Sequence, residues 1–413
     1  MEQRSAPLRL IPYRLPLRRP WRSAHGELND RQGWLVTAGR GPHRGHGDCA
    51  PLPDAGTETL ENAAARLAHW QARAHDQSDQ QLLDALRAAS PSPTPAADAA
   101  VETALLDQRA RAAGLPLRAL LHPTAAKVVH VPVNAALGTL IACTPRMLQQ
   151  AARQGFRVVK LKVGTAPLEA ELAHLRTLLA AAPHTCQLRL DANGAWDLPD
   201  AHRFLAALEH LPPQPNTGIP IIESLEEPLR QPRDEALAQL QAATSIPLAL
   251  DESLPQHPWP TDASQFPVRR IILKPGVLGG LRPSLDRARL ALTAGIQPLV
   301  TSLIDSAAGI WAAAELAAAI TALSREIPEG ADCHNLCQGL ATADWLAADL
   351  GQPPSLSDGR LRLSARPGSG FLPFGKGDGA TDPHVHAHAG DAADLGAGAC
   401  DDAGANADLG PPA

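Results

Sequence analysis

The chain has 413 residues, of which 44% are hydrophobic, 19% are charged and only 3% are aromatic. This composition can bury a sizeable core, which excludes wholesale disorder, and the length fits two or three domains. Residues 1–376 contain 37 Lys and Arg against 36 Asp and Glu, without a basic stripe, so we expect no nucleic-acid partner. The sequence contains no strongly apolar stretch of about 18 residues, so we expect no membrane span. Six cysteines without paired spacing predict a reduced, cytoplasmic protein.

The first 122 residues are predicted to form one α+β unit. A Ser- and Pro-rich loop over 90–95 separates two segments with helical spacing, and Gly114 and Pro116 mark the end of the second segment. The expected elements, in chain order, are strands over 11–17 and 33–38 and helices over 57–74 and 96–113. Four arginines lie in or near the connection between the two strands: Arg18, Arg19, Arg22 and Arg31.

Residues 123–340 alternate short β-rich runs with longer helical stretches. Such alternation predicts parallel βαβ units, and seven or more in series favour a barrel over a doubly wound sheet, which has the same local pattern. Residues 376–413 consist mostly of Ala, Gly and Asp and are predicted to be a disordered acidic tail, because they cannot bury enough apolar surface to offset the ordering entropy. The expected strands are 128–134, 158–162, 187–191, 219–226, 246–251, 270–274 and 296–302.

Charged residues close the predicted strands. Lys160 and Lys162 are two apart in one strand, so both side chains project to the same face. The carboxyl ends of barrel strands converge on one rim, so we expect the strand-end side chains to meet there. A single strand-end acid is more often a helix cap or turn residue, but four consecutive charged strand ends disfavour that reading. The next strands end in Asp191, Glu226, Asp251 and Lys274, with successive separations from Lys162 of 29, 35, 25 and 23 residues.

Three carboxylates at close range repel one another unless a cation neutralises them. Oxygen donors from separate strands suit Mg²⁺ best, with Mn²⁺ as the alternative. Asn193 lies on the same face as Asp191 and fits two roles equally well, as a turn former or as a residue that supports Asp191 without binding the metal. The pattern therefore predicts a divalent-cation site made by Asp191, Glu226 and Asp251.

Together, these motifs resemble the enolase superfamily and, within it, the muconate-lactonizing subgroup. The likeness extends over most of residues 8–375. An early segment, GHGDCAPLP at 45–53, resembles the family's G-x-G-E-x-x-P-L-P, with Asp48 in place of Glu. The other motifs are ETALLDQRARAAGLPL at 102–117, GFRVVKLKVG at 155–164, LDANGAW at 190–196, LEEP at 225–228, LDES at 250–253 and ILKPG at 272–276.

The resemblance implies an α/β fold, a modified TIM barrel of the type (β/α)₇β, with an N-terminal α+β capping domain over 1–122. The barrel would occupy 123–340, and residues 341–375 would return to the cap. The resemblance also implies Mg²⁺ ligands at the three strand-end acids Asp191, Glu226 and Asp251.

Roles for the other strand-end residues also follow from the resemblance. Lys162 corresponds to the general base, Lys160 to its electrostatic partner and Lys274 to a lysine on the opposite face of the substrate. Thr301 and Ser302 correspond to a Ser-rich strand end that holds the substrate, and they keep two of its three hydroxyls.

Within the subgroup, the chain is most similar to o-succinylbenzoate synthases of the proteobacterial type. This similarity implies a metal-dependent dehydratase, a lyase of menaquinone biosynthesis. Its reaction would convert 2-succinyl-6-hydroxy-2,4-cyclohexadiene-1-carboxylate to o-succinylbenzoate by lysine-mediated proton abstraction, through a Mg²⁺-stabilised enediolate. The expected partner is therefore a small carboxylate substrate, and nothing in the sequence indicates an oligomeric state.

Other functions remain open on the same fold. An N-succinylamino acid racemase or a dipeptide epimerase would use Lys162 and Lys274 as bases on two faces, and muconate cycloisomerase is a further option. Asp305, the single acid near the last strands, argues weakly against the epimerase. A non-catalytic barrel is least favoured, because none of the six metal-ligand and lysine positions is missing.

Overall fold

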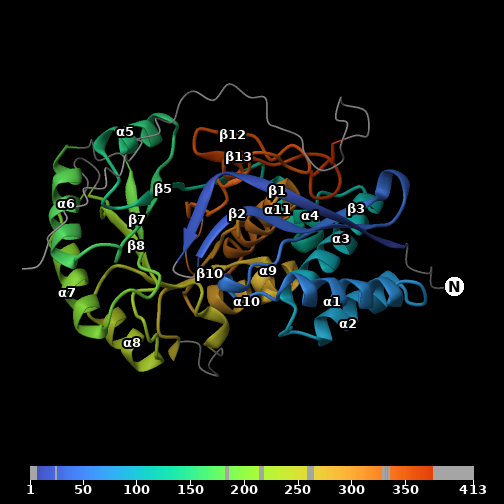
Figure 1. The fold of residues 1–413 in the computed structure, drawn as a ribbon, viewed down its shortest axis with the longest axis horizontal. Helices are drawn as coiled ribbons and strands as arrows, with labels where there is room; N and C mark the ends of the chain where they lie inside the picture. The colour runs from blue at the N-terminus through green and yellow to red at the C-terminus, as the bar shows by residue number, and fades with distance from the viewer. Residues whose placement is uncertain are drawn as a thin grey trace, which may run out of the picture.

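The computed structural model describes residues 7–23, 26–181, 186–213, 218–257, 265–327, 331, 333 and 335–374. The predicted tail over 376–413 lies outside these residues. Figure 1 shows the barrel helices α5 to α8 along the left edge of the molecule, the helices α1 to α3 on the right, and the blue N-terminal hairpin crossing between them. The molecule therefore combines a parallel-stranded barrel with an N-terminal α+β unit.

A long hairpin begins the N-terminal unit. Strand β1 (Leu8–Ser23) pairs antiparallel with β2 (Gly26–Ala38), whose other edge pairs with β3 (Gly45–Cys49). The prediction of an arginine-bearing loop here was wrong, because the arginines belong to the two strands. Prolines such as Pro12 and Pro16 made the strand appear shorter in the sequence than β1 is in the structure. However, β1 is an edge strand, where the missing N–H of proline need not break the ladder.

Four helices follow this sheet in the chain, and the third packs tightly against it. Fourteen of the 18 residues of α3 are buried. A Cβ added to Gly47 of β3 would lie 2.0 Å from the carbonyl oxygen of Ala100 in α3, so only glycine allows this approach. The helices are α1 (Leu60–Arg73), α2 (Asp79–Ala88), α3 (Pro95–Ala112) and α4 (Leu117–Leu121).

Seven parallel strands form the barrel sheet, in the spatial order β11-β10-β9-β8-β7-β6-β5. Residues 338–339 supply the eighth position. Gly339 N donates to Val300 O at 2.9 Å, and Asn134 N donates to Gln338 O at 3.0 Å, so these residues join the two edges and close the barrel. The strands are β5 (Ala135–Thr139), β6 (Val158–Lys162), β7 (Gln187–Asp191), β8 (Ile222–Glu226), β9 (Leu248–Leu250), β10 (Arg270–Leu273) and β11 (Gln297–Val300).

The first barrel strand differs from the prediction over 128–134. Strand β4 (His130–Pro132) pairs antiparallel with β13 (Arg360–Arg362), which also pairs with β12 (Leu356–Ser357), in a small separate sheet. The barrel strand is instead β5, whose sequence AALGT has low β-propensity. Of its five residues only Ala135 is buried, so pairing with β6, rather than intrinsic preference or burial, determines this strand.

Helices follow most barrel strands. They are α5 (Pro145–Arg153), α6 (Leu168–Ala181), α7 (Leu198–Glu209), α8 (Asp234–Ala242), α9 (Pro275–Leu278), α10 (Leu281–Thr293) and α11 (Ala307–Ser324). Between β9 and β10, the described residues contain only short 3₁₀ structure such as Leu254–Gln256.

Helix α11 and the cysteines belong to the core. Among the described residues, α11 is the one helix long and apolar enough to cross a membrane, but 89% of it is buried inside the protein. This is the expected environment of a core helix.

The five cysteines that the structure describes are also buried, with no disulfide between them.

A buried ion pair joins the N-terminal unit to α11. Arg118 Nη1 donates to Glu315 Oε1 at 2.7 Å, and the two side chains are 3% and 0% exposed. Arg118→Ala should reduce the free energy of unfolding by about 3–5 kcal/mol, because it leaves a buried carboxylate without its partner. Urea denaturation measures this loss. Arg87→Ala, which breaks an exposed pair with Asp286, should cost less than about 1 kcal/mol, and equal losses would contradict the prediction.

Candidate active site at the carboxyl ends of the barrel strands

The strand register brings the predicted site residues to one level. Lys162 is opposite Asp191, and Asp191 is opposite Glu226, each at the last position of its strand. Asp251 and Lys274 directly follow β9 and β10. All five residues therefore lie at the carboxyl end of the barrel, although 112 positions separate the first from the last.

Lys160 lies between two of the carboxylates. Its Nζ is 3.0 Å from Asp191 Oδ2 and also donates to Glu226 Oε2. Asp191 and Glu226 are 3% and 1% exposed. Burial alone would lower the pKa of Lys160, but the charges of Asp191, Glu226 and Asp251 outweigh burial and raise it. Burial opposes ionisation of Asp191, yet Lys160 and Lys162 hold the pKa of that carboxyl below its usual range.

Asp251 faces a second lysine, which follows the neighbouring strand β10. Lys274 Nζ is 2.7 Å from Asp251 Oδ1 and 3.5 Å from Glu252 Oε1. Asp251 Oδ1 is nevertheless buried without a well-aligned hydrogen bond. Burial and the Glu252 charge raise the pKa of Asp251 more than Lys274 lowers it, so the negative charge of Asp251 is incompletely compensated.

Lys162 is the most accessible of the three lysines, with 39% of its side chain exposed. Its Nζ donates to Asn193 Oδ1 and lies 3.8 Å from Asp191 Oδ2. Asn193 has a φ of 43°, a left-handed conformation that asparagine tolerates, and its N–H donates to Asp191 Oδ1 at 3.1 Å. Asn193 therefore forms the turn and also contacts both Lys162 and Asp191.

Thr301 and Ser302 follow β11 at the same end of the barrel. Thr301 Oγ1 donates to Gly339 O at 2.9 Å, and Ser302 Oγ lies 2.7 Å from Thr342 Oγ1. Both side chains are half-buried. Their hydroxyls thus connect the end of β11 with the eighth strand position and with Thr342 after it.

The donor chemistry fits a divalent cation, although the carboxylates are held by lysines in this structure. Within the described ranges, no three Asp, Glu, His or Cys side chains come close enough together to hold a metal ion. The Lys160 ammonium, between Asp191 and Glu226, demonstrates that this position stabilises positive charge. The undercompensated Asp251 supplies a third buried oxygen donor, and such a set suits Mg²⁺.

A charged layer below the strand ends was not anticipated from the sequence. Arg189 donates to Glu223 at 3.0 and 3.1 Å, and Arg270 Nη1 lies 2.7 Å from Glu223 Oε1. Arg189 Nε is also 3.8 Å from Glu226 Oε1. Arg189 lies two positions before Asp191, so both side chains lie on the same face of β7. This spacing could have indicated a buried charge below the strand end.

Glu227, beside a predicted ligand, supports the next strand end. Its Oε1 accepts hydrogen bonds from Asp251 N at 2.5 Å and from Ser253 N at 3.0 Å, and it has a φ of 42°. Glu227 therefore holds the turn that carries Asp251, a role that adjacent sequence position alone does not reveal.

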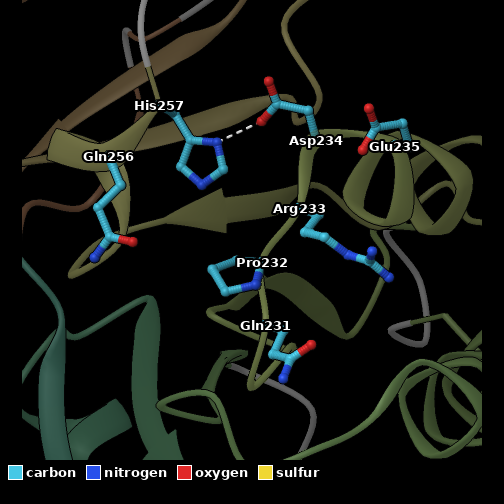
Figure 2. A pocket seen from close by; sticks show the side chains of 7 residues that line it. All are labelled: Gln231, Pro232, Arg233, Asp234, Glu235, Gln256 and His257. Atoms are coloured by element: carbon cyan, nitrogen blue, oxygen red, sulfur yellow. Dashed lines mark hydrogen bonds and ion pairs between the residues drawn. The ribbon is translucent and has the colours of Figure 1, made fainter.

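Two hollows flank the strand ends. A cavity of about 540 Å³ lies beside the residues that follow β8 and β9, where Figure 2 shows the ring of His257 turned toward Asp234, its partner at 2.5 Å. None of the predicted site residues lines this cavity. A much smaller hollow of about 10 Å³ is bounded by Ala55 of the N-terminal unit together with Asp251 and Lys274. The N-terminal unit therefore covers the Lys274 side of the site closely.

Comparison with known proteins finds relatives that match both the N-terminal unit and the barrel. Residues 145–373 match the Enolase C-terminal domain-like family, and residues 5–94 match the MenC, N-terminal domain family. The o-succinylbenzoate synthase of Thermosynechococcus vestitus is 32% identical over 344 residues, which are 82% of this chain and 93% of that protein. The chain belongs to the enolase superfamily. The resemblance to its muconate-lactonizing subgroup, with o-succinylbenzoate synthases among the relatives, is confirmed.

Other relatives of this enolase-superfamily chain have different names. The hydrophobic dipeptide epimerase of Roseobacter litoralis is 29% identical, over 74% of this chain and 85% of that protein. The solved structure of the dipeptide epimerase from Methylococcus capsulatus, complexed with Mg and the dipeptide L-Arg-D-Lys, is 26% identical and has a TM-score of 0.74. The match covers 90% of this chain and 100% of the epimerase chain. The expected fold class is confirmed, and the relatives are enzymes with more than one reaction.

Proposed function

We propose that the protein is an o-succinylbenzoate synthase-like dehydratase and a lyase. The observation that carries this proposal is the similarity to a relative of that name over 93% of the relative's length. The lysines and carboxylates at the barrel end support it chemically. In this proposal residues 1–122 form the cap, 123–340 the catalytic barrel and 341–375 a segment that returns to the cap.

In the proposed reaction, Lys162 Nζ removes the proton next to the substrate carboxylate. The electron pair of the broken C–H bond moves into that carboxylate. It then returns to form the new C=C bond of the ring, while the C–O bond of the ring hydroxyl breaks and its electron pair leaves with the hydroxide. The Lys162 ammonium returns its proton to the leaving hydroxide, so the products are o-succinylbenzoate and one water. Asn193 Oδ1, which accepts a hydrogen bond from Lys162 Nζ, orients the base.

The other proposed site residues balance charge or hold the substrate. Asp191, Glu226 and Asp251 would hold Mg²⁺, which supplies positive charge where the substrate carboxylate gains negative charge. Lys160 and Lys274 offset negative charge from two sides, and Lys274 lies beside Asp251. Thr301 and Ser302 hold the succinyl end of the substrate.

Dehydration should exceed racemisation when the two are assayed side by side. We expect the purified chain with Mg²⁺ and the cyclohexadiene substrate to form the aromatic product, followed by ultraviolet absorbance. In parallel, N-succinylamino acids and dipeptides in deuterated water should exchange their α-protons with a lower kcat/KM, measured by NMR. An exchange faster than dehydration would contradict the proposal.

That outcome would favour the second candidate, an N-succinylamino acid racemase or dipeptide epimerase. The relative from Roseobacter litoralis supports this candidate, as do lysines on β6 and after β10 that can approach a substrate from two faces. Muconate cycloisomerase remains a further alternative on the same fold.

A further inference from the structure

The turn after β11 adopts a conformation that its sequence disfavours. Ile304 has a φ of 59°, in the left-handed region that β-branched residues rarely occupy. A strained residue persists only where the surrounding structure holds it in place. This turn, residues 302–306, begins at Ser302 of the proposed substrate site, so its shape affects the mouth of the barrel.

Arg31 of β2 holds the middle of the turn. Its Nε donates to Ile304 O at 3.3 Å. Its other hydrogen bonds run to Ala50 O at 2.5 Å and Pro51 O at 2.9 Å, both just after β3. Arg31 is only 2% exposed, so its guanidinium joins the cap to the turn from inside the protein.

Asp48 of β3 holds the end of the turn. Its Oδ2 accepts hydrogen bonds from Ser306 N at 2.9 Å and Ser306 Oγ at 2.8 Å, and its Oδ1 accepts one from Tyr13 OH at 2.6 Å. A Cβ added to Gly309 would lie 3.0 Å from Asp48 Oδ2, so the carboxylate sits tightly against the first turn of α11. The N-terminal unit therefore contacts the turn at two points, through Arg31 and Asp48.

The same unit also holds the neighbouring loop. Ala347 N donates to Pro16 O of β1 at 2.8 Å, and Ser302 Oγ meets Thr342 Oγ1 at 2.7 Å. The two loops beside β11 and the eighth strand position are thus linked to each other and to the cap. Lys162, on β6, makes none of these contacts.

We propose that Arg31 and Asp48 are positioning residues that hold residues 302–306 in shape and so set the affinity for the end of the substrate that contacts Ser302. They act through this turn and take no part in proton transfer. The inference rests on the proposed function only in assuming that the barrel mouth binds the substrate.

The test compares Asp48→Asn and Arg31→Met with Asp30→Asn, a matched cap substitution whose side chain contacts Arg14 rather than the turn. We expect KM to rise about tenfold in the first two variants, because each weakens the contact with the turn by about one charge-assisted hydrogen bond. The kcat of both variants should stay within about threefold of the wild type. Amide hydrogen exchange of residues 302–306 should become faster in both. Asp48→Glu, which keeps the carboxylate, should restore part of the affinity.

Exchange at 302–306 that matches the wild type in both variants would overturn the positioning role, even if activity falls. Faster exchange with an unchanged KM would overturn the link to affinity. If the wild type dehydrates nothing, the proposed function fails separately, while hydrogen exchange still decides whether Arg31 and Asp48 hold the turn.

Discussion

Lys162→Ala is expected to remain folded and to lose about 10²–10⁴-fold in kcat, the usual contribution of a general base. Lys162 ends β6, and its Nζ is oriented by Asn193 Oδ1. Because 39% of the side chain is exposed, the substitution removes little packing and should change the free energy of unfolding by about 0.5 kcal/mol or less.

Steady-state kinetics of the dehydration and thermal unfolding followed by circular dichroism measure the two effects. Lys127→Ala is the control, because Lys127 is an exposed lysine after α4, away from the barrel end. It should behave as the wild type in both measurements. Near-full turnover by Lys162→Ala would remove this residue as the base.

Glu226→Gln is expected to lower the affinity for Mg²⁺ by more than about 100-fold, since even residues that merely support a ligand contribute about 10–100-fold. Glu226 is 1% exposed and lies between Lys160 and Arg189. A neutral amide at this position would leave the side chains of Lys160 and Arg189 without a full counter-charge. It would also remove one of the three anionic side chains proposed to bind Mg²⁺. Asp191→Asn should produce a similar loss.

Calorimetric titration with Mg²⁺ measures the affinity without requiring turnover. Glu235→Gln, an exposed substitution on α8, is the control and should bind as the wild type does. A chelator should stop wild-type turnover, and added Mg²⁺ should restore it. Unchanged Mg²⁺ binding by both Glu226→Gln and Asp191→Asn, or turnover that persists in the chelator, would contradict the proposed metal site.

The strand-end residues could be predicted because their spacing is local. Each β/α unit repeats a strand and a helix, so a charged residue at the end of each strand is visible along the chain as a regular series. The register then brought Lys162, Asp191 and Glu226 to one level, as expected. The Lys160 position between two carboxylates was not visible in that spacing, because it depends on side-chain reach across three strands.

Elements that depend on pairing or contacts with distant segments could not be predicted in the same way. Strand β5, with the sequence AALGT, has no period-two pattern and becomes a strand only through its neighbours in the barrel. Strand β1 contains prolines that its edge position tolerates. Similarly, nothing near Ile304 in the sequence indicates a left-handed residue, because Arg31 and Asp48 hold that turn from more than 250 positions away.

By itself, the sequence determined the alternation of strands and helices from β6 to β11 and the residue types at the strand ends, and it favoured a barrel. Periodic patterns and strand-end chemistry are carried by residues close together in the chain. Only the tertiary structure decided how Arg31 and Asp48 of the N-terminal unit contact the turn after β11. It also decided that Arg189 and Arg270 pair with Glu223 below the strand ends, and that residues 338–339 close the barrel. These features arise from contacts between distant segments, whose partners are not encoded in any local pattern.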